Sequence, residues 1–390
     1  MSKYDYYLKS LEKTREQSLS SSLHFAVGME KKGDSPFLNF ASNDLLGLST
    51  HPKVQESALH SLLEWGVGST PWRPLYSYLE AHREVEEQLA RLLGKESALF
   101  FPSAHGAHHQ LLTTLMSPHS MIFIDRFAHH ELIKAAVASK AQLFRYEHHN
   151  LHQLESLLQK ATPTHQKWII TESLFGIDGT RSSLNEIEDI AKRYDALTYI
   201  DDTHSVGMMG KKGMGLAAQR KNIDLVFGSF GQQSGRFGAY LGTSTLLRDY
   251  LLSSHPTLER STLLPPIGLG AVKGVIELIP EMGEVRKNIL SLSTKLRTAL
   301  KESNWKTVKE KSHIMPLLFS QDVRAHSKCQ AISHALLKEK ILLATLRPPY
   351  VPQGAERLRL MVNATHQEED IIRLLNALQN GLEERSLAVI

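Results

Sequence analysis

Short apolar runs alternate with helical stretches from Phe37 to about Leu264, and this alternation sets the fold class. The runs are continuously apolar, which is typical of strands buried on both faces of a parallel sheet. Between them lie helical patterns such as SYLEAHREVEEQLARLL, with Val85, Leu89 and Leu92 on one face. The pattern predicts an α/β domain with a mostly parallel sheet. The runs are SALFF, MIFID, WIITESLF, LTYIDD, LVFGSF and AYLGTS.

The remaining chain predicts two further parts, because 390 residues exceed one ordinary core. The first 30 or so residues read as an amphipathic helix that ends in the polar linker SLSSSLH. After STLLPP, a helical pattern from 268 to 303 precedes the runs IMPLLFS, ILLATLRPP and RLRLMVNA and a closing helix. We therefore predict a helix and linker over 1–44, a large domain over 45–265 and a small α+β domain over 266–390.

Composition excludes several classes of protein. The net charge of +4 is mild and the basic residues are scattered, so nucleic-acid binding is not expected. The single cysteine, Cys329, excludes an internal disulfide and fits a reducing compartment. The N-terminal residues lack an apolar signal core, and no stretch reaches about 18 apolar residues. We expect a cytoplasmic protein without a membrane segment.

Polar residues follow three of the apolar runs. Ligands of α/β sheets bind beyond the carboxyl ends of strands, so three such groups and a glycine-rich loop at 228–238 favour one shared site. A single group of this kind is more often a helix cap or a solvated loop. The groups are Glu172 with Asp178, then Asp201, Asp202 and His204, and finally Asp125, His129 and His130.

Two other kinds of site are less well supported. His129, His204 and Asp201 could bind a metal, but they lie in separate segments without HExxH or paired CxxC spacing, so no metal is predicted. Most of the 20 histidines are interpreted as surface or packing residues. A serine hydrolase is disfavoured because FGSFG lacks the G-x-S-x-G pattern.

Taken together, seven segments closely resemble the α-oxoamine synthases, over residues 38–378. This family condenses an amino acid with an acyl-CoA and depends on pyridoxal 5'-phosphate (PLP). The resemblance implies PLP-dependent transferase fold type I, with a mostly parallel seven-stranded sheet and a smaller α+β C-terminal domain. Its biotin-pathway branch, which joins alanine to a pimeloyl thioester, is most similar. The segments are LNFASNDLLGLSTHP, ALFFPSAHGAHHQ, IDRFAHHELI, TESLFGIDG, IDDTHSVGMMGKKGMG, STLLPP and RPPYVPQGAERLRL.

The resemblance also implies how the cofactor is held. Asp201 corresponds to the carboxylate that keeps the ring nitrogen protonated, whereas Asp202 is interpreted as a structural neighbour. His204 would bond the phenolic oxygen, and His129 would stack on the ring. The remaining cofactor positions are Glu172 and the phosphate contacts Ala104, His105 and Ser229. Thr262 is a further phosphate contact, which the family supplies from the neighbouring subunit, so a homodimer is implied.

The expected substrates are a small amino acid and an acyl-CoA or acyl-carrier thioester. Glu172 and Asn43 match polar residues near the substrate. Arg359 matches the arginine that binds the amino acid's carboxylate, and Arg347 is a second candidate. Strand alternation puts Arg357 and Arg359 on the same face, so the period alone cannot choose between these two.

The chain departs from the family at Gln232, where the family has the Schiff-base lysine. Glutamine has no nucleophilic or basic nitrogen, so we expect PLP to be bound non-covalently. The segment TPWRP at 70–74 also replaces a glycine-rich stretch near the acyl site. Two interpretations remain open: an acyltransferase impaired at Gln232, and a catalytically silent subunit, such as the serine palmitoyltransferase branch contains.

Overall fold

The structure is a computed structural model, and it describes most of the chain between residues 37 and 386. The helix predicted near the N-terminus lies outside the described residues, apart from Asp5. The side chains of Gln232 and of residues 381–386 are outside the description as well. The described ranges are 37–68, 80–162, 164–232, 238–254, 263–319, 325–348 and 350–386.

Seven strands form the large sheet, in the order β2-β8-β7-β6-β5-β3-β4. Neighbouring strands are parallel except at β8, which runs antiparallel to both β2 and β7. The prediction of a mostly parallel seven-stranded sheet is confirmed. The strands are β2 (Ser97–Phe101), β3 (Ser120–Asp125), β4 (Gln142–Tyr146), β5 (Gln166–Glu172), β6 (Ala196–Asp201), β7 (Leu225–Ser229) and β8 (Ala239–Thr243).

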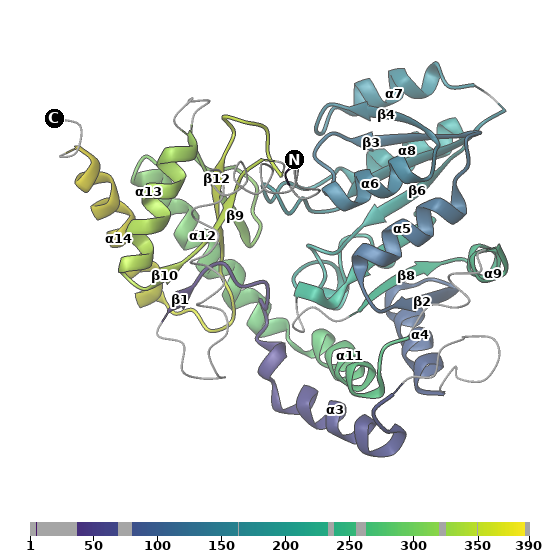
Figure 1. Cartoon of the computed structure of the whole chain (residues 1–390), viewed down its shortest axis with the longest axis horizontal. Helices are drawn as coiled ribbons and strands as arrows, with labels where there is room; N and C mark the ends of the chain where they lie inside the picture. Colours follow the sequence, from purple (N-terminus) through teal and green to yellow (C-terminus); the bar gives the residue numbers. More distant parts are fainter. Residues whose placement is uncertain are drawn as a thin grey trace.

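Helices cover both faces of this sheet (Figure 1). One face packs against α5, α6 and α9, and the other packs against α4, α7, α8 and α11. Strand residues alternate between the two cores: Leu99 and Phe101 enter the first and Phe100 the second. The helices are α4 (Glu80–Leu93), α5 (Ala104–Leu115), α6 (His130–Ala138), α7 (Leu151–Gln159), α8 (Leu184–Tyr194), α9 (Thr245–Ser254) and α11 (Pro266–Leu278).

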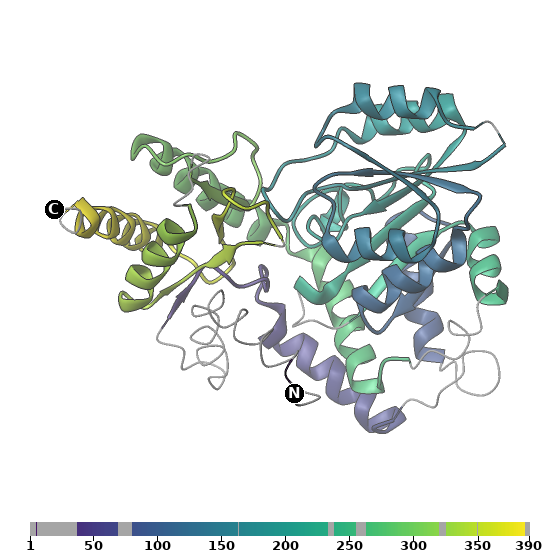
Figure 2. The same ribbon diagram turned by 45° about the horizontal axis from the view of Figure 1, so that its top comes forward.

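A smaller unit lies to one side of the large sheet (Figures 1 and 2). Its antiparallel sheet has the order β11-β12-β9, and β1 pairs with β10 in parallel. The early segment around β1 thus joins strands from the other end of the chain, and the boundaries proposed at 44 and 265 stay a prediction. The elements are β1 (Leu38–Asn39), β9 (Ile314–Leu318), β10 (Ile341–Leu342), β11 (Ala344–Leu346), β12 (Arg357–Met361), α12 (Gly283–Glu302), α13 (Ala325–Lys338) and α14 (Glu368–Ser386).

The helix predicted over 268–303 is two helices in the structure. α11 ends at Leu278, the 3-10 segment η4 covers Ile279–Glu281, and α12 begins at Gly283. Pro280 lies within η4, and proline has no N–H to donate and a ring that clashes with the preceding turn. The apolar periodicity continued through this break, so the prediction of one helix was wrong.

Helix α11 also packs closely along α3 (Pro52–Trp65), and Figure 2 shows the two helices side by side. Gly270 permits this approach, because a Cβ there would overlap the backbone oxygen of Ser57. The Ser57 hydroxyl in turn donates to the Gly270 carbonyl at 2.7 Å. The pair therefore connects a helix that precedes the large sheet in the sequence to a helix that follows it. The other 3-10 segments are η1 (Leu48–Thr50), η2 (Lys211–Gly213) and η3 (Phe230–Gln232).

Cysteine content and hydropathy set two further expectations. Cys329 is a buried free thiol, in agreement with the expected absence of an internal disulfide. Within the described part of the chain, every helix is too short or too polar to span a bilayer.

Candidate active site

The carboxyl ends of the parallel strands meet at one edge of the large sheet. β5 ends at Glu172, β6 ends at Asp201 and β7 ends at Ser229. Glu172 and Asp201 are register partners across β5 and β6, so the two acidic residues lie side by side. Glu172 and Asp201, which follow separate apolar runs in the sequence, are therefore neighbours at this edge, whereas Asp125 and Asp178 lie outside the cavity lining described below.

Asp201 is almost completely buried and has two hydrogen-bonding neighbours. Its Oδ2 lies 3.3 Å from His108 Nε2, and its Oδ1 accepts the Thr203 backbone N–H at 3.0 Å. The other ring nitrogen of His108 lies 2.8 Å from the Tyr199 hydroxyl. Burial raises the pKa of Asp201, but the hydrogen bond and charge of His108, together with Thr203, outweigh burial and lower it to about 2. Asp201 is therefore ionised at neutral pH.

Glu172 has the opposite titration behaviour. It is 3% exposed, and its Oε2 accepts the Gly176 backbone N–H at 3.3 Å. Burial raises the pKa of Glu172 well above its usual range, and the negative charge of Asp201 raises it further. Two carboxyl groups on neighbouring strands thus have pKa values that are driven apart, so one can carry a proton while the other is ionised.

His204 lies against the loop that follows β5. A Cβ on Gly176 would overlap the His204 imidazole, so glycine is what allows the loop to pass this close. Burial lowers the pKa of His204, and the positive charge of Arg359 adds to this, which brings the pKa to about 3. The imidazole is therefore neutral at physiological pH.

A cavity of about 650 Å³ opens at this edge and contains unpaired polar atoms. Arg359 Nη1 donates to the Gly176 carbonyl at 3.0 Å, whereas Arg359 Nε is buried without a hydrogen-bond partner among the described residues. The side-chain oxygen of Asn43 is also buried without a hydrogen-bond partner among the described residues. A ligand with one carboxylate and one donor could pair both atoms. The predicted site residues that line the cavity are Asn43, His129, Glu172, His204 and Arg359.

The structure distinguishes the three candidate arginines. Arg359 lines the cavity, whereas Arg357 directs its Nε to the Ala355 carbonyl at 3.2 Å and lies outside the lining. Arg347 directly follows β11, and its neighbour Leu346 contributes to the lining although Arg347 does not. Of the three, Arg359 is best placed to bind a carboxylate in the cavity.

The start of α5 offers backbone donors to an anion. Ser103 caps this helix: its hydroxyl accepts the Gly106 N–H at 3.3 Å and its carbonyl accepts the Ala107 N–H at 3.1 Å. The N–H groups of Ala104 and His105 donate to no protein acceptor in the described residues. A helix N-terminus with unpaired N–H groups favours a phosphate or carboxylate.

The loop after β7 lies beside this helix start. Ser229 donates to the Gly238 carbonyl at 3.1 Å, and the Gly238 N–H donates to the Pro102 carbonyl at 3.2 Å. The segment η3 directly follows β7 and ends at Gln232, whose side chain is not among those that the structure describes. Thr262 and the TPWRP segment also fall outside the described residues, so these predictions remain predictions.

His129 lines the cavity, and its neighbour Glu131 contacts the start of α5. It precedes α6, and its Nδ1 accepts the Glu131 backbone N–H at 3.4 Å. Its side chain is exposed and lines the cavity. Glu131 in turn pairs with His105 at 2.5 Å, so the N-termini of α5 and α6 are neighbours. The predicted stacking of His129 on a cofactor ring stays a prediction.

Two buried histidines belong to this region but were not singled out from the sequence. His108 contacts Asp201, and its place four residues after Ala104 on one helix face was a signal for it. His313 is fully buried, and neither of its ring nitrogens has a hydrogen-bond partner among the described residues. Burial, followed by the charge of Arg359, lowers the pKa of His313 to about 3. Nothing in its sequence context indicated this position.

Comparisons with known proteins identify the family of this chain. The sequence profile of the family described as aminotransferase class I and II matches residues 35–378. An 8-amino-7-oxononanoate synthase of Gluconacetobacter diazotrophicus is 32% identical over 366 residues, 92% of this chain and 91% of the relative. One from Geobacter sulfurreducens is 32% identical over 378 residues, 94% of this chain and 95% of the relative.

Solved structures show the same fold. Serine palmitoyltransferase of Sphingomonas wittichii superposes with a TM-score of 0.88 at 22% identity, over 100% of this chain and 99% of that one. The 8-amino-7-oxononanoate synthase of Francisella tularensis has a TM-score of 0.79 at 22% identity, over 90% of this chain and 100% of that one. The chain therefore belongs to the aminotransferase class I and II family and, within it, to the PLP-dependent α-oxoamine synthases.

Proposed function

We propose that the chain binds PLP and is an acyltransferase of the 8-amino-7-oxononanoate synthase type. It would condense a small amino acid, alanine first, with an acyl thioester and release carbon dioxide. The extent of the similarity to relatives of that name supports this reaction. One observation carries the proposal: Asp201 and His204, both with lowered pKa values, lie at one sheet edge, and Arg359, whose Nε has no partner among the described residues, contacts the loop at Gly176 beside it.

The residues at this edge fit the charges of PLP. The N–H groups of Ala104 and His105, which have no acceptor among the described residues, suit the phosphate. The Ser229 hydroxyl, the third donor expected there, would have to turn from the Gly238 carbonyl to the phosphate. The ionised carboxylate of Asp201 suits a protonated ring nitrogen, and His108 keeps that carboxylate oriented. When bound, PLP supplies an electron sink that stabilises negative charge at the amino acid's α-carbon.

The chain's own residues would then bind and orient the amino acid. Arg359 offers a planar guanidinium whose buried Nε has no other partner among the described residues, so a substrate carboxylate would gain a strong charge-assisted pair. His204, being neutral, can donate a hydrogen bond to a developing oxyanion without adding charge. Glu172 holds a proton at its buried carboxyl group and stays close to Asp201 without repulsion.

Gln232 limits what this site can do. The side-chain amide neither accepts a proton from the α-carbon nor attaches PLP covalently, so we propose non-covalent cofactor binding and low turnover. This part of the proposal rests on the resemblance at this sequence position. In the structure, Gln232 is the last residue of η3, which directly follows β7.

Absorbance and fluorescence titration of the full chain with PLP tests cofactor binding directly. We expect saturable binding, and we expect peptide mapping after borohydride reduction to find no pyridoxyl-lysine within 224–240. Failure to bind PLP would contradict the proposal. A reduced lysine adduct elsewhere in the site would overturn the role given to Gln232, while leaving cofactor binding intact.

The same glutamine favours a second candidate, a catalytically silent subunit. A chain without the base could keep the fold and PLP and serve an active relative.

We also propose a homodimer with the site at its boundary, because Thr262 matches a residue that the family supplies across subunits. Light scattering gives the mass. Mixing Asp201→Asn and Thr262→Ala variants in a Gln232→Lys background tests the shared site, since mixed dimers should regain activity.

A further inference from the structure

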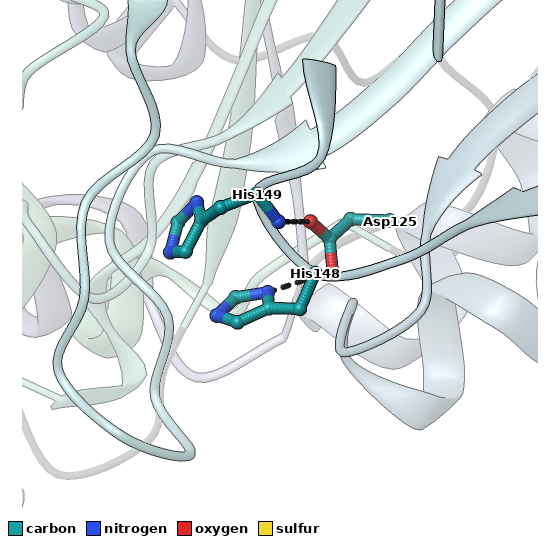
Figure 3. A group of neighbouring side chains, drawn as sticks. All are labelled: Asp125, His148 and His149. Atoms are coloured by element: carbon teal, nitrogen blue, oxygen red, sulfur yellow. Dashed lines mark hydrogen bonds and ion pairs between the residues drawn. The ribbon is translucent and has the colours of Figure 1, made fainter. Parts of the chain in front are cut away.

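A second polar cluster lies at the same sheet edge, outside the lining of the cavity (Figure 3). Asp125 is the last residue of β3, and His148 and His149 follow β4. One potential ligand atom of each residue lies within 4.8 Å of the other two. We propose that Asp125, His148 and His149 bind a divalent transition-metal ion, zinc above all. This proposal is independent of the proposed function.

The carboxylate of Asp125 is held in place by the backbone. The residue is 1% exposed. Its Oδ1 accepts the Phe127 N–H at 2.7 Å and lies 2.9 Å from His148 Nδ1. Its Oδ2 accepts the His149 N–H at 3.1 Å. Figure 3 shows the contacts of both histidines with this carboxylate. A carboxylate and two imidazoles are ligand types that Zn²⁺ prefers, and a water would complete four-coordination.

His148 has the outer partners that a metal-binding histidine needs. Its Nε2 lies 3.3 Å from Asp178 Oδ2 and 3.1 Å from Thr180 Oγ1. Asp178 is itself fixed by the Thr180 N–H at 3.0 Å and hydroxyl at 2.7 Å. A carboxylate that accepts the N–H of one ring nitrogen orients the other nitrogen toward a metal. Here that other nitrogen is Nδ1, on the side of Asp125.

His149 supplies the second imidazole from the exposed side. Its φ of 58° lies in the left-handed region, which is uncommon for residues other than glycine, although Asn, Asp and His are enriched there. This conformation brings its ring centroid to 3.8 Å from that of His148, and its Nε2 lies 2.7 Å from Thr180 Oγ1. Because the side chain is exposed, an ion has access and the ring has room to turn.

Binding would exchange one proton for one metal ion. Zn²⁺ takes the place of the Nδ1–H hydrogen of His148, which is released to solvent, while Nε2–H continues to donate to Asp178. Zn–N and Zn–O bonds of about 2.0–2.2 Å with tetrahedral angles separate two ligand atoms by about 3.4 Å. The distance of 2.9 Å between His148 Nδ1 and Asp125 Oδ1 therefore has to increase by a few tenths of an ångström when the ion binds.

The bound ion would join the ends of β3 and β4 next to the cavity. Phe127, which lines the cavity, stacks on His148 with ring centroids 4.6 Å apart. Ligation would thus fix one wall of the cavity and stabilise the folded chain, because an ion that binds only the folded state raises the unfolding temperature.

Calorimetric titration of the metal-stripped full chain with ZnCl₂, in the absence of PLP, tests the site. We expect one saturable site, no comparable binding of MgCl₂ and a raised melting temperature with zinc. His149→Asn should weaken zinc binding at least tenfold, and asparagine also tolerates a positive φ, so the turn should fold. Asp178→Asn should weaken it by about 10- to 100-fold. His152→Asn, an exposed change on α7, is the matched control and should bind like the unaltered chain.

Cobalt gives a second readout that ordinary surface histidines would not mimic. Co²⁺ bound at this site should show the intense visible absorption of low-coordinate cobalt, lost in His149→Asn and kept in His152→Asn. If the unaltered chain shows no saturable zinc site, or if His149→Asn binds zinc equally well, the cluster is a hydrogen-bonded network only and the proposal is wrong. Neither result affects PLP binding, which is measured separately.

Discussion

Asp201 and Asp202 are consecutive, and both are buried, yet their surroundings have opposite effects. Asp201 faces His108 on α5, which lowers its pKa to about 2 against the effect of burial. Asp202 is fully buried, and burial raises its pKa to about 6 although hydroxyl and N–H donors oppose this. Those donors are Ser173 and Ser205 hydroxyls and the N–H groups of Leu216 and Ala217.

The difference shows that burial alone does not set the charge of a carboxyl group. Asp201 has the imidazole of His108 beside it, whereas the donors to Asp202 among the described residues are hydroxyl and backbone N–H groups. The carboxylate of Asp202 accepts the N–H groups of Leu216 and Ala217, which connects this later segment to the end of β6. We propose that Asp201 at the end of β6 takes part in the chemistry and that Asp202 supports the structure, and four substitutions test this division.

Gln232→Lys should have the largest effect, because it adds a base and a nucleophile at the sequence position where the family has its Schiff-base lysine. We expect condensation of alanine with an acyl-CoA to rise by about 10²–10⁴-fold, the usual contribution of a positioned general base. Release of CoA measures the rate, and borohydride trapping locates the modified lysine. Gln233→Lys is the neighbouring control. Covalent attachment without condensation of any acyl donor would favour the silent subunit.

Asp202→Asn should change the pH dependence of stability. Since the folded-state pKa is raised above the usual 3.8, the folded chain binds more protons than the unfolded chain between about pH 4 and 6. The unfolding free energy of the unaltered chain therefore falls over this interval, by about 3 kcal/mol from this group, and the variant lacks that fall. Urea unfolding from pH 4 to 7 measures the difference between the two proteins.

Asp201→Asn supplies the contrast to that measurement. A lowered pKa contributes stability that is present above about pH 4 and is lost only as the pH falls toward 2, so its profile above pH 5 should parallel that of the unaltered chain. The variant should instead bind PLP about 10- to 100-fold more weakly, as expected for loss of a charge-assisted hydrogen bond. Unchanged PLP affinity would remove Asp201 from the proposed site.

Gly176→Ala should affect the chemistry least, because it removes no polar side chain from the site. The new Cβ would overlap His204, and relieving such a contact costs about 1–3 kcal/mol. We expect a lower unfolding midpoint and weaker alanine binding, because Arg359 also donates to the Gly176 carbonyl. Gly283→Ala is the control, since its nearest atom would be 3.9 Å away. Equal behaviour of the two variants would mean that the loop shifts without disturbing the imidazole.

Much of the fold follows from the sequence. All six apolar runs of the large domain became strands, because a strand buried on both faces must be continuously apolar. β4 was not among them. It is the outermost strand on one side of the sheet, and its residues Gln142 and Arg145 are exposed. Its sequence QLFRY therefore carries little of the apolar pattern that identified the others.

The sequence by itself also determined which residue types stand at the strand ends, since each follows its own apolar run. Only the tertiary structure decided which of them meet. The alternating period left Arg357 and Arg359 equivalent, and the packing of β12 beside the loop at Gly176 put Arg359 in the cavity. Asp125 and His148 are 23 residues apart, and crossover through α6 makes their strands neighbours. Local pattern encodes burial and conformation, whereas long-range contacts depend on strand order and helix packing, which no single segment contains.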